Sequence, residues 1–261
     1  MEANRLPAGR EREVIYLDSA SIAGAPVAYV VVMAAVIAAF SFVPFSIVLS
    51  AGSSFPMSQG LYPLAGWILG PWAGAVACGV GSLVGIFLAP HTAGIPWISV
   101  PSAASAALFA GVLVPRGRNR LWLGLSAIVV LEVILFWRHA VIRNAVDPWR
   151  FLDAYLVHFV GIAFFLTPFR FVIGRLVASP DLRRVALGFF LGTWCAASLM
   201  MVGESMAGYF VLNWPSELFV MFSVVVPIEH MIRSAIGAVA GTGVVAGLRA
   251  MALVRAREAR F

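Results

Sequence analysis

Apolar runs alternate with short polar stretches along almost the whole chain. The longest uncharged run covers residues 61–90, and a helix of about 20 residues is enough to cross a hydrocarbon core of about 30 Å. The pattern predicts an all-α, polytopic membrane bundle of six to seven transmembrane helices. The predicted segments are residues 25–50, 61–90, 102–114, 121–137, 151–178, 185–212 and 216–254.

Small residues recur at helical spacing inside these segments, and we expect them to form the faces on which the helices pack. In lipid, helices associate through close van der Waals contact rather than through hydrophobic burial. We therefore predict that the 61–90 helix is the packing centre of the bundle; the alternative is the ordinary enrichment of glycine in membrane helices. Its two tracks are Gly66, Gly70 and Gly74, and Ala73, Ala77, Gly81 and Gly85.

Prolines predict several breaks in these segments. Pro44 should kink the first segment and Pro168 the fifth, and Pro227 should divide the last one. Pro90, Pro96 and Pro101 should together prevent a continuous helix over residues 90–101.

Composition supports a membrane protein and argues against a nucleic-acid-binding one. The chain is 61% hydrophobic and 11% charged, whereas soluble domains carry about 25% charged residues. The net positive charge of the chain (+6 at pH 7) comes from arginines at the ends of apolar segments. We therefore expect contact with membrane lipid and no nucleic-acid binding. No signal peptide is evident in the first 25 residues. Cys78 and Cys195 lie in apolar runs, which favours buried free thiols over a disulfide or metal site.

The charge distribution predicts one transmembrane domain, residues 25–254, between a polar tail at 1–24 and a basic tail at 255–261. An even number of segments separates the arginine loops 116–120 and 179–184 from each other and from the C-terminus. All three can therefore be cytoplasmic in a multi-pass cell-membrane protein. Three segments precede the first loop, so the N-terminal tail falls outside unless one of them fails to cross.

Six ionisable residues lie inside the apolar segments: Glu132, His158, Arg170, Glu204, Glu229 and Arg233. Each costs about 2.5–3.5 kcal/mol on insertion scales, which makes it a candidate functional group. Glu229 and Arg233 have the i, i+4 spacing of a structural ion pair, and Arg170 is placed to snorkel. Glu132 and Glu204 have no basic residue one turn away, so each must face another helix, a cavity or water. His158 is either a hydrogen-bonded packing residue or a ligand-binding one.

No enzyme signature is present. The chain lacks HExxH, GxSxG and GxxxxGK[ST], and its four histidines show no metal-ligand spacing. The sequence therefore predicts no catalysis, no cofactor and no metal. Any ATP-driven step would need a partner ATPase.

Four stretches carry a family resemblance. They are the Ala34/Ala38 and Ala35/Ala39 pairs of the first segment, LAGWILGPWAGAVACGVGSLVG at 64–85, IPWISVPSAASAALFAGVL at 95–113 and PIEHMIRSAIGAVAGTGVVAGL at 227–248. Together they cover about half the chain. In their order the chain resembles the membrane-embedded substrate-binding subunit (S component) of energy-coupling-factor (ECF) vitamin transporters.

The resemblance implies a bundle that binds a vitamin-like solute from outside, while a transmembrane scaffold protein and paired cytoplasmic ATPases drive its release. It also implies that Ala34, Ala35, Ala38 and Ala39 dock on the scaffold and that the loop 51–62 is a lid. The chain departs from the family in its extra length over 140–215, so no family role transfers to Glu204. The arginine loop 116–120 also lies where the family's six-span plan has an external loop.

Four hypotheses follow. The first is a solute-binding subunit whose pocket has Tyr62, Trp67 and Trp97 as walls and Glu132, His158 and Glu204 as polar groups. The second is a non-catalytic scaffold, assembly factor or sensor anchor whose two acids pair with neighbouring chains. The others are an intramembrane enzyme that uses the buried acids and a proton- or ion-coupled carrier with Glu204 as its relay.

Overall fold

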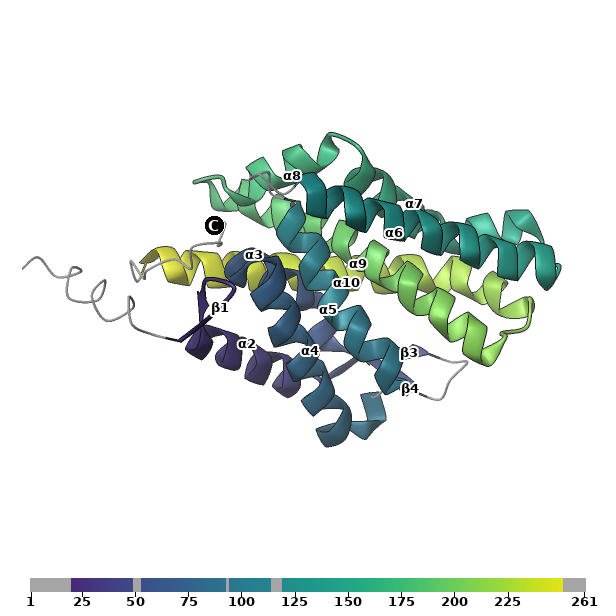
Figure 1. The fold of residues 1–261 in the computed structure, drawn as a ribbon, viewed down its shortest axis with the longest axis horizontal. Helices are drawn as coiled ribbons and strands as arrows, with labels where there is room; N and C mark the ends of the chain where they lie inside the picture. Colours follow the sequence, from purple (N-terminus) through teal and green to yellow (C-terminus); the bar gives the residue numbers. More distant parts are fainter. Residues whose placement is uncertain (1–19, 49–52, 93, 114–118, 251–261) are drawn as a thin grey trace, which may run out of the picture.

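The computed structural model describes residues 20–48, 53–92, 94–113 and 119–250. Helices dominate this part of the chain (Figure 1). They are α2 (Val27–Phe40), α3 (Tyr62–Leu69), α4 (Pro71–Leu88), α5 (Pro96–Val112), α6 (Asn119–Trp137), α7 (Pro148–Leu166), α8 (Phe169–Val177), α9 (Leu182–Leu212) and α10 (Glu217–Ala250). Short single turns also occur at η1 (Met57–Gly60), η2 (Pro90–Thr92) and η3 (Arg138–Arg143).

Two small antiparallel hairpins interrupt the helices. The first pairs β1 (Ser21–Ile22) with β2 (Ala25–Pro26) just before α2. The second pairs β3 (Pro44–Val48) with β4 (Ser53–Pro56) just after it. Residues 1–19 of the predicted polar tail and all of the basic tail 255–261 lie outside the described residues.

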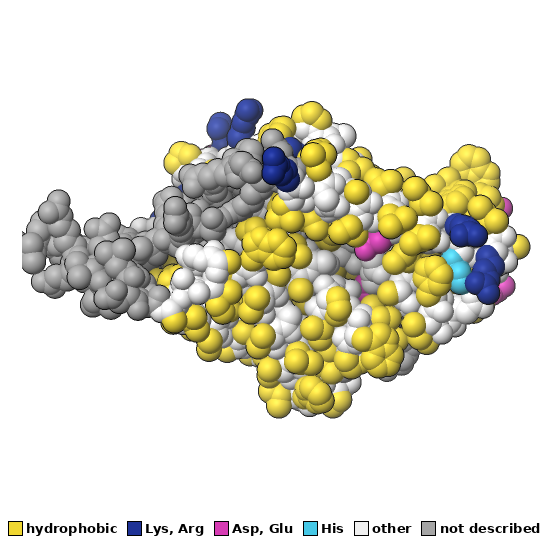
Figure 2. All heavy atoms as spheres, viewed as in Figure 1, with side chains coloured by type: hydrophobic (Ala, Val, Ile, Leu, Met, Phe, Trp, Pro, Cys, Tyr) yellow, Lys and Arg dark blue, Asp and Glu magenta, His cyan; other side chains and the backbone are white. Residues whose placement is uncertain are grey.

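Within the described residues, five helical stretches are long and apolar enough to cross a membrane, which supports a multi-pass membrane protein. Helices α2 and α5 are apolar but shorter, so the predicted number of six to seven spans is met only if these two are counted. Figure 2 shows hydrophobic side chains over most of the middle of one face, with basic side chains near two ends. The long stretches are Pro71–Leu88, Arg120–Arg143, Pro148–Leu166, Leu182–Leu212 and Glu217–Ala250.

The predicted single helix over 61–90 is wrong, because the chain reverses at Gly70. This glycine has φ 87°, a conformation that residues with a Cβ rarely adopt, and it separates α3 from α4. The two helices then pack antiparallel: a Cβ at Gly74 would lie 2.8 Å from the backbone of Ala65, and the Cys78 thiol donates to the Tyr62 carbonyl (3.6 Å). Every residue of α3 is buried, among α4, α5 and α9.

Small residues do mediate the closest helix contacts. A Cβ at Gly81 would lie 2.6 Å from the Ala34 carbonyl oxygen, and one at Gly111 would lie 2.6 Å from Pro71 Cα. Ala34 and Ala38 are buried on the face of α2 that meets α4, whereas Ala35 and Ala39 are exposed. Of the four predicted docking alanines, only Ala35 and Ala39 therefore lie on a surface that a partner can reach.

From α2 to α7 successive helices alternate in direction, and α8 continues in the direction of α7, since both pack antiparallel to α9. Helix α2 runs parallel to α4, because Gly81 lies beside Ala34 and Gly85 lies beside Ser41, so α3 supplies the return path between them. Four elements thus precede the first arginine loop instead of three. In Figure 1, β1 and the last turns of α10 lie at the left and the β3–β4 hairpin lies at the right. The start of the described chain, the connection between α8 and α9, and the end of α10 therefore lie at the same end of the bundle; Arg249 near the end of α10 donates to the Ser179 carbonyl in that connection.

The proline predictions are met in part. Residues 90–101 do not form one continuous helix, since η2 ends at Thr92 and α5 begins at Pro96. However, Pro101 lies inside α5 and Pro227 inside α10, and both helices continue through them. Near Pro101, Ser102 donates its hydroxyl to the Ile98 carbonyl (2.8 Å), the kind of side-chain bond that helps a helix tolerate proline in lipid. The first segment ends at Phe40 and turns into β3 instead of continuing to residue 50. Pro168 does more than bend its segment, since α7 ends before it and α8 begins after it.

A glycine pair tests the close packing. Gly81→Ala should lower the free energy of unfolding by about 1–3 kcal/mol, because the added methyl must displace the α2 backbone. Gly124→Ala is the matched control: a Cβ there meets nothing within 4 Å, so stability should stay equal or rise. Thermal unfolding in detergent measures both. Equal losses in the two variants would contradict the packing described here.

Single-cysteine variants test on which side of the membrane the ends of the helices lie. Ser21→Cys and Asp181→Cys should react with a membrane-impermeant maleimide from one side, and Asp147→Cys should react from the other. All three positions are exposed, while the native Cys78 and Cys195 are buried and should stay unlabelled. Labelling of Ser21→Cys and Asp181→Cys from opposite sides would show that α3 does not act as a return path.

Candidate functional site

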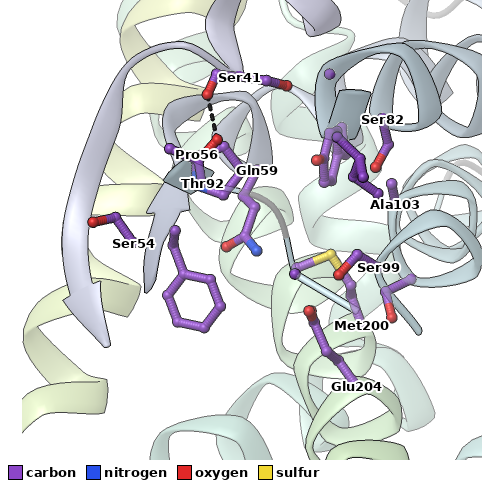
Figure 3. Close-up of a pocket in the computed structure, with 16 residues that line it drawn as sticks. Ser41, Ser54, Pro56, Gln59, Ser82, Thr92, Ser99, Ala103, Met200 and Glu204 are labelled. Atoms are coloured by element: carbon purple, nitrogen blue, oxygen red, sulfur yellow. Dashed lines mark hydrogen bonds between the residues drawn. The ribbon is translucent and has the colours of Figure 1, made fainter. Parts of the chain in front are cut away.

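A polar cavity lies beside the β3–β4 hairpin (Figure 3). In Figure 1 this hairpin lies toward the side of the bundle away from β1. Its volume is about 50 Å³, which is room for a few water molecules. The lining comes from the end of α2, β4, η1 and η2, and from α3, α4, α5 and α9. The lining residues are Ser41, Ser54, Phe55, Pro56, Gln59, Tyr62, Ser82, Gly85, Ile86, Thr92, Gly94, Ser99, Ser102, Ala103, Met200 and Glu204.

Seven of the sixteen lining residues carry a hydroxyl group. Ser41, Ser58 and Tyr62 form a chain of side-chain contacts, with 3.3 Å between the two serine oxygens and 3.2 Å from Ser58 to the Tyr62 hydroxyl. Thr92 donates its hydroxyl to the Ser41 carbonyl and so ties η2 to the end of α2. The hydroxyls thus hold the cavity walls together and also face its interior.

The β3–β4 hairpin and η1 cover the cavity. Ser54, Phe55 and Pro56 of β4 belong to the lining. The ring of Phe55 stacks on that of Phe45 at 6.3 Å, and Met57 donates its backbone N–H to the Val43 carbonyl (2.8 Å). The described part of the predicted lid, residues 53–62, therefore supplies five lining residues; residues 51 and 52 lie outside the described residues.

Arg233 of α10 contacts both the β3–β4 hairpin and η1 from inside the bundle. The guanidinium is 1% exposed, and its Nε and Nη2 donate to Gln59 Oε1 at 3.1 and 2.9 Å. Its carbon also lies 5.3 and 5.7 Å from the ring centres of Phe45 and Phe55. A buried cation needs such partners, because removing it from water is costly.

Two carboxylates balance the buried charge. Glu229, one turn before Arg233 on α10, and Glu204 on α9 both lie close enough for their negative charges to stabilise the guanidinium. Of these two acids, Glu204 lines the cavity. The cavity wall is therefore linked to Arg233 in two ways, by the hydrogen bonds of Gln59 and by the charge of Glu204.

The histidines lie deeper, behind Arg233. His230 Nε2 is 3.0 Å from the Trp194 carbonyl oxygen, which can only accept, so Nε2 carries the proton. His230 Nδ1 is then free to accept from Arg233 Nη1 at 3.3 Å. The His158 ring lies 5.1 Å from the His230 ring, and its Nδ1 has no hydrogen-bond partner within the described ranges. His158 thus belongs to this buried cluster and does not line the cavity.

The structure separates the other predicted site residues. Tyr62 and Glu204 line the cavity together. Trp67 is fully buried and packs edge-on against Phe189 at 4.9 Å, and Trp97 is 71% exposed on the outside of α5. The Glu132 carboxylate lies against Gly203 on α9, where an added Cβ would be 3.1 Å from its Oε1. These three residues do not line the cavity.

Sequence reasoning missed the residues that give the cavity its character. Gln59 and the serines of α4 and α5 were not among the candidates, because hydroxyl and amide side chains are common in loops and membrane helices. One usable signal existed: the polar run at 51–60 lies between two apolar segments.

Comparison with family models, with curated proteins and with solved structures finds no match to this chain in any of the three. The resemblance to ECF S components therefore stays a prediction that depends on the four quoted stretches.

The contact between Gln59 and Arg233 can be tested by stability. Gln59→Leu should lower the free energy of unfolding by about 1–3 kcal/mol or more, because a buried guanidinium loses its acceptor. Gln59→Glu keeps the shape and an acceptor, so we expect a smaller loss. Tryptophan fluorescence during thermal unfolding measures both. An equal loss in the two variants would mean that packing, and not the hydrogen bonds, accounts for the effect.

Proposed function

We propose that the chain is an integral membrane subunit that binds a small polar solute for transport. The observation that carries this proposal is the hydroxyl-, amide- and carboxylate-lined cavity beneath the β3–β4 hairpin, inside an otherwise apolar bundle. Solute sites in proteins are typically concave, with a few convergent polar groups among apolar walls. Here Phe55, Ile86 and Met200 are the apolar walls, while Gln59 and Glu204 are convergent polar groups.

The orientation of the cavity supports uptake. More of the described arginines lie at the end of the bundle where the described chain starts and α10 ends (Arg120, Arg175, Arg183, Arg184 and Arg249) than at the other end (Arg138, Arg143 and Arg150), so the positive-inside rule favours a cytoplasmic location for the first end. The C-terminus would then be cytoplasmic, and the cavity would lie toward the outer face of the cell membrane. The β3–β4 hairpin would close over a solute that arrives from outside.

The size of the cavity sets a condition on this function. A volume of about 50 Å³ is too small for a vitamin-like molecule, which needs several times the space of a few waters. The hairpin must therefore move outward to admit the solute. Its contacts with the bundle are local, with Arg233 beneath Phe45 and Phe55 and with η2 beside β4, so this movement does not require the helices to separate.

Energy for release would come from other proteins. The chain carries no nucleotide-binding motif, and its resemblance to ECF S components favours a transmembrane scaffold with cytoplasmic ATPases as partners. The exposed Ala35 and Ala39 on α2 are the docking positions that remain open to such a scaffold.

One observation favours a second candidate, a scaffold or assembly subunit. Glu132 is only half-buried near the middle of α6, and its Oε2 has no hydrogen-bond partner among the described residues. A basic side chain on a neighbouring membrane helix would neutralise it. This candidate predicts a stable complex with other chains and no bound solute.

Native mass spectrometry of the protein purified gently from its own membranes tests the first candidate. We expect a co-purifying small molecule that is lost in Glu204→Gln, because this substitution removes the cavity's carboxylate. Glu217→Gln, at an exposed end of α10, is the matched control and should retain it. Protein partners without any small molecule, unchanged by both substitutions, would instead favour the scaffold candidate.

A further inference from the structure

Arg233 determines which way the Gln59 amide faces. A guanidinium has five N–H donors and no acceptor, and two of them point at the same amide atom of Gln59. That atom must be the oxygen, so the NH₂ group must lie on the other side of the amide. The orientation therefore follows from the chemistry of arginine and does not depend on how the two amide atoms are labelled.

The Gln59 NH₂ group, which Arg233 does not contact, faces the same cavity as the Glu204 carboxylate. Gln59 and Glu204 both line the cavity, and Figure 3 shows them reaching into the same space from η1 and from α9. No hydrogen bond between described residues uses Gln59 Nε2. Ser99 lies near the carboxylate of Glu204. The cavity therefore presents a neutral donor beside a strong acceptor.

We propose that the solute has a matching edge, an N–H group next to a carbonyl or ring nitrogen, as in a carboxamide, a lactam, a ureide or an aminopyrimidine. Its N–H would donate to Glu204, and its acceptor would receive the N–H of Gln59. This inference deepens the proposed function and rests on it. Within the site, Arg233 is a positioning residue, because it acts through Gln59.

Other solute classes fit less well. A carboxylate or phosphate would face the negative charge of Glu204, while the positive charge of Arg233 is already shared by Glu204 and Glu229. A cation with donors only would satisfy Glu204 but would leave the Gln59 NH₂ group unpaired. Sites built to pair a particular group discriminate strongly against analogues that lack it.

Benzamide and benzoate form a matched probe pair that tests this. They share the ring, and they differ in whether the polar end is a neutral donor–acceptor pair or an anion that only accepts. We expect the wild-type protein in lipid nanodiscs to bind benzamide about tenfold or more tighter than benzoate, measured by ligand-observed NMR titration. Benzoate binding equal to or tighter than benzamide would overturn the proposal.

Two substitutions locate the effect. Gln59→Glu keeps an acceptor for Arg233 but replaces the NH₂ donor with a carboxylate oxygen, so benzamide should bind about tenfold more weakly through loss of its donor, and benzoate should weaken further because the added negative charge repels it; the preference for benzamide should therefore rise. Glu204→Gln adds a donor and removes the charge, so benzoate binding should improve. Glu217→Gln should change neither. The ratio of the two affinities is the readout, because a general loosening of the fold would weaken both.

The outcomes separate this proposal from the proposed function. An unchanged ratio in Gln59→Glu and Glu204→Gln, or no benzamide binding at about 10 mM, the weak range expected of so small a fragment, would overturn the solute class. If a small molecule still co-purifies in that case, solute binding itself stands. If no small molecule co-purifies and neither probe binds, both proposals fall.

Discussion

The reversal of the chain at Gly70 is the constraint on which most of this architecture depends. A backbone with φ 87° turns α3 back along α4, and this return path lets α2 and α4 run in the same direction. It also carries η1 into the bundle, where Gly60 contacts Ile236 and Gln59 contacts Arg233. Without the reversal, α3 would continue straight into α4 and could not serve as the return path between α2 and α4. The cavity would also lose Gln59 and Tyr62 from its wall.

The buried guanidinium is the second organising element, and it depends on the first. Arg233 is enclosed by groups from four parts of the chain: Gln59 on η1, the Phe45 and Phe55 rings of the hairpin, His230 on its own helix, and the charge of Glu204 on α9. An unpaired cation in an apolar interior would be strongly unfavourable, so these contacts favour this mutual arrangement of the segments. The same contacts give the cavity its donor and its acceptor.

The two candidate functions use different parts of the molecule. Solute binding uses the cavity beside the β3–β4 hairpin, where polar side chains from eight segments converge. A scaffold role would use the lipid-facing surfaces, above all the half-buried Glu132 on α6 and the exposed alanine pair on α2. Because these surfaces do not overlap with the cavity lining, a subunit that binds a solute and also docks on partners is physically consistent with the fold.

The sequence by itself determined the class of the protein, the approximate positions of its apolar helices and the small residues at their contacts. These features depend on local properties, namely hydropathy over about 20 residues and the spacing of glycine and alanine. It also identified Tyr62 and Glu204, because an aromatic hydroxyl and an unpaired acid are conspicuous in an apolar run. It placed Trp97 and Trp67 in the pocket, although one faces outward and the other packs in the core.

Only the tertiary structure decided which glycine breaks a helix and which proline does not. Gly66, Gly70 and Gly74 look alike in sequence, yet only Gly70 has a positive φ, because the turn between α3 and α4 falls there. Pro101 and Pro227 remain inside helices, and next to Pro101 the Ser102 hydroxyl donates to the Ile98 carbonyl. The pairing of Gln59 with Arg233 joins residues 174 positions apart, a contact that no local pattern encodes.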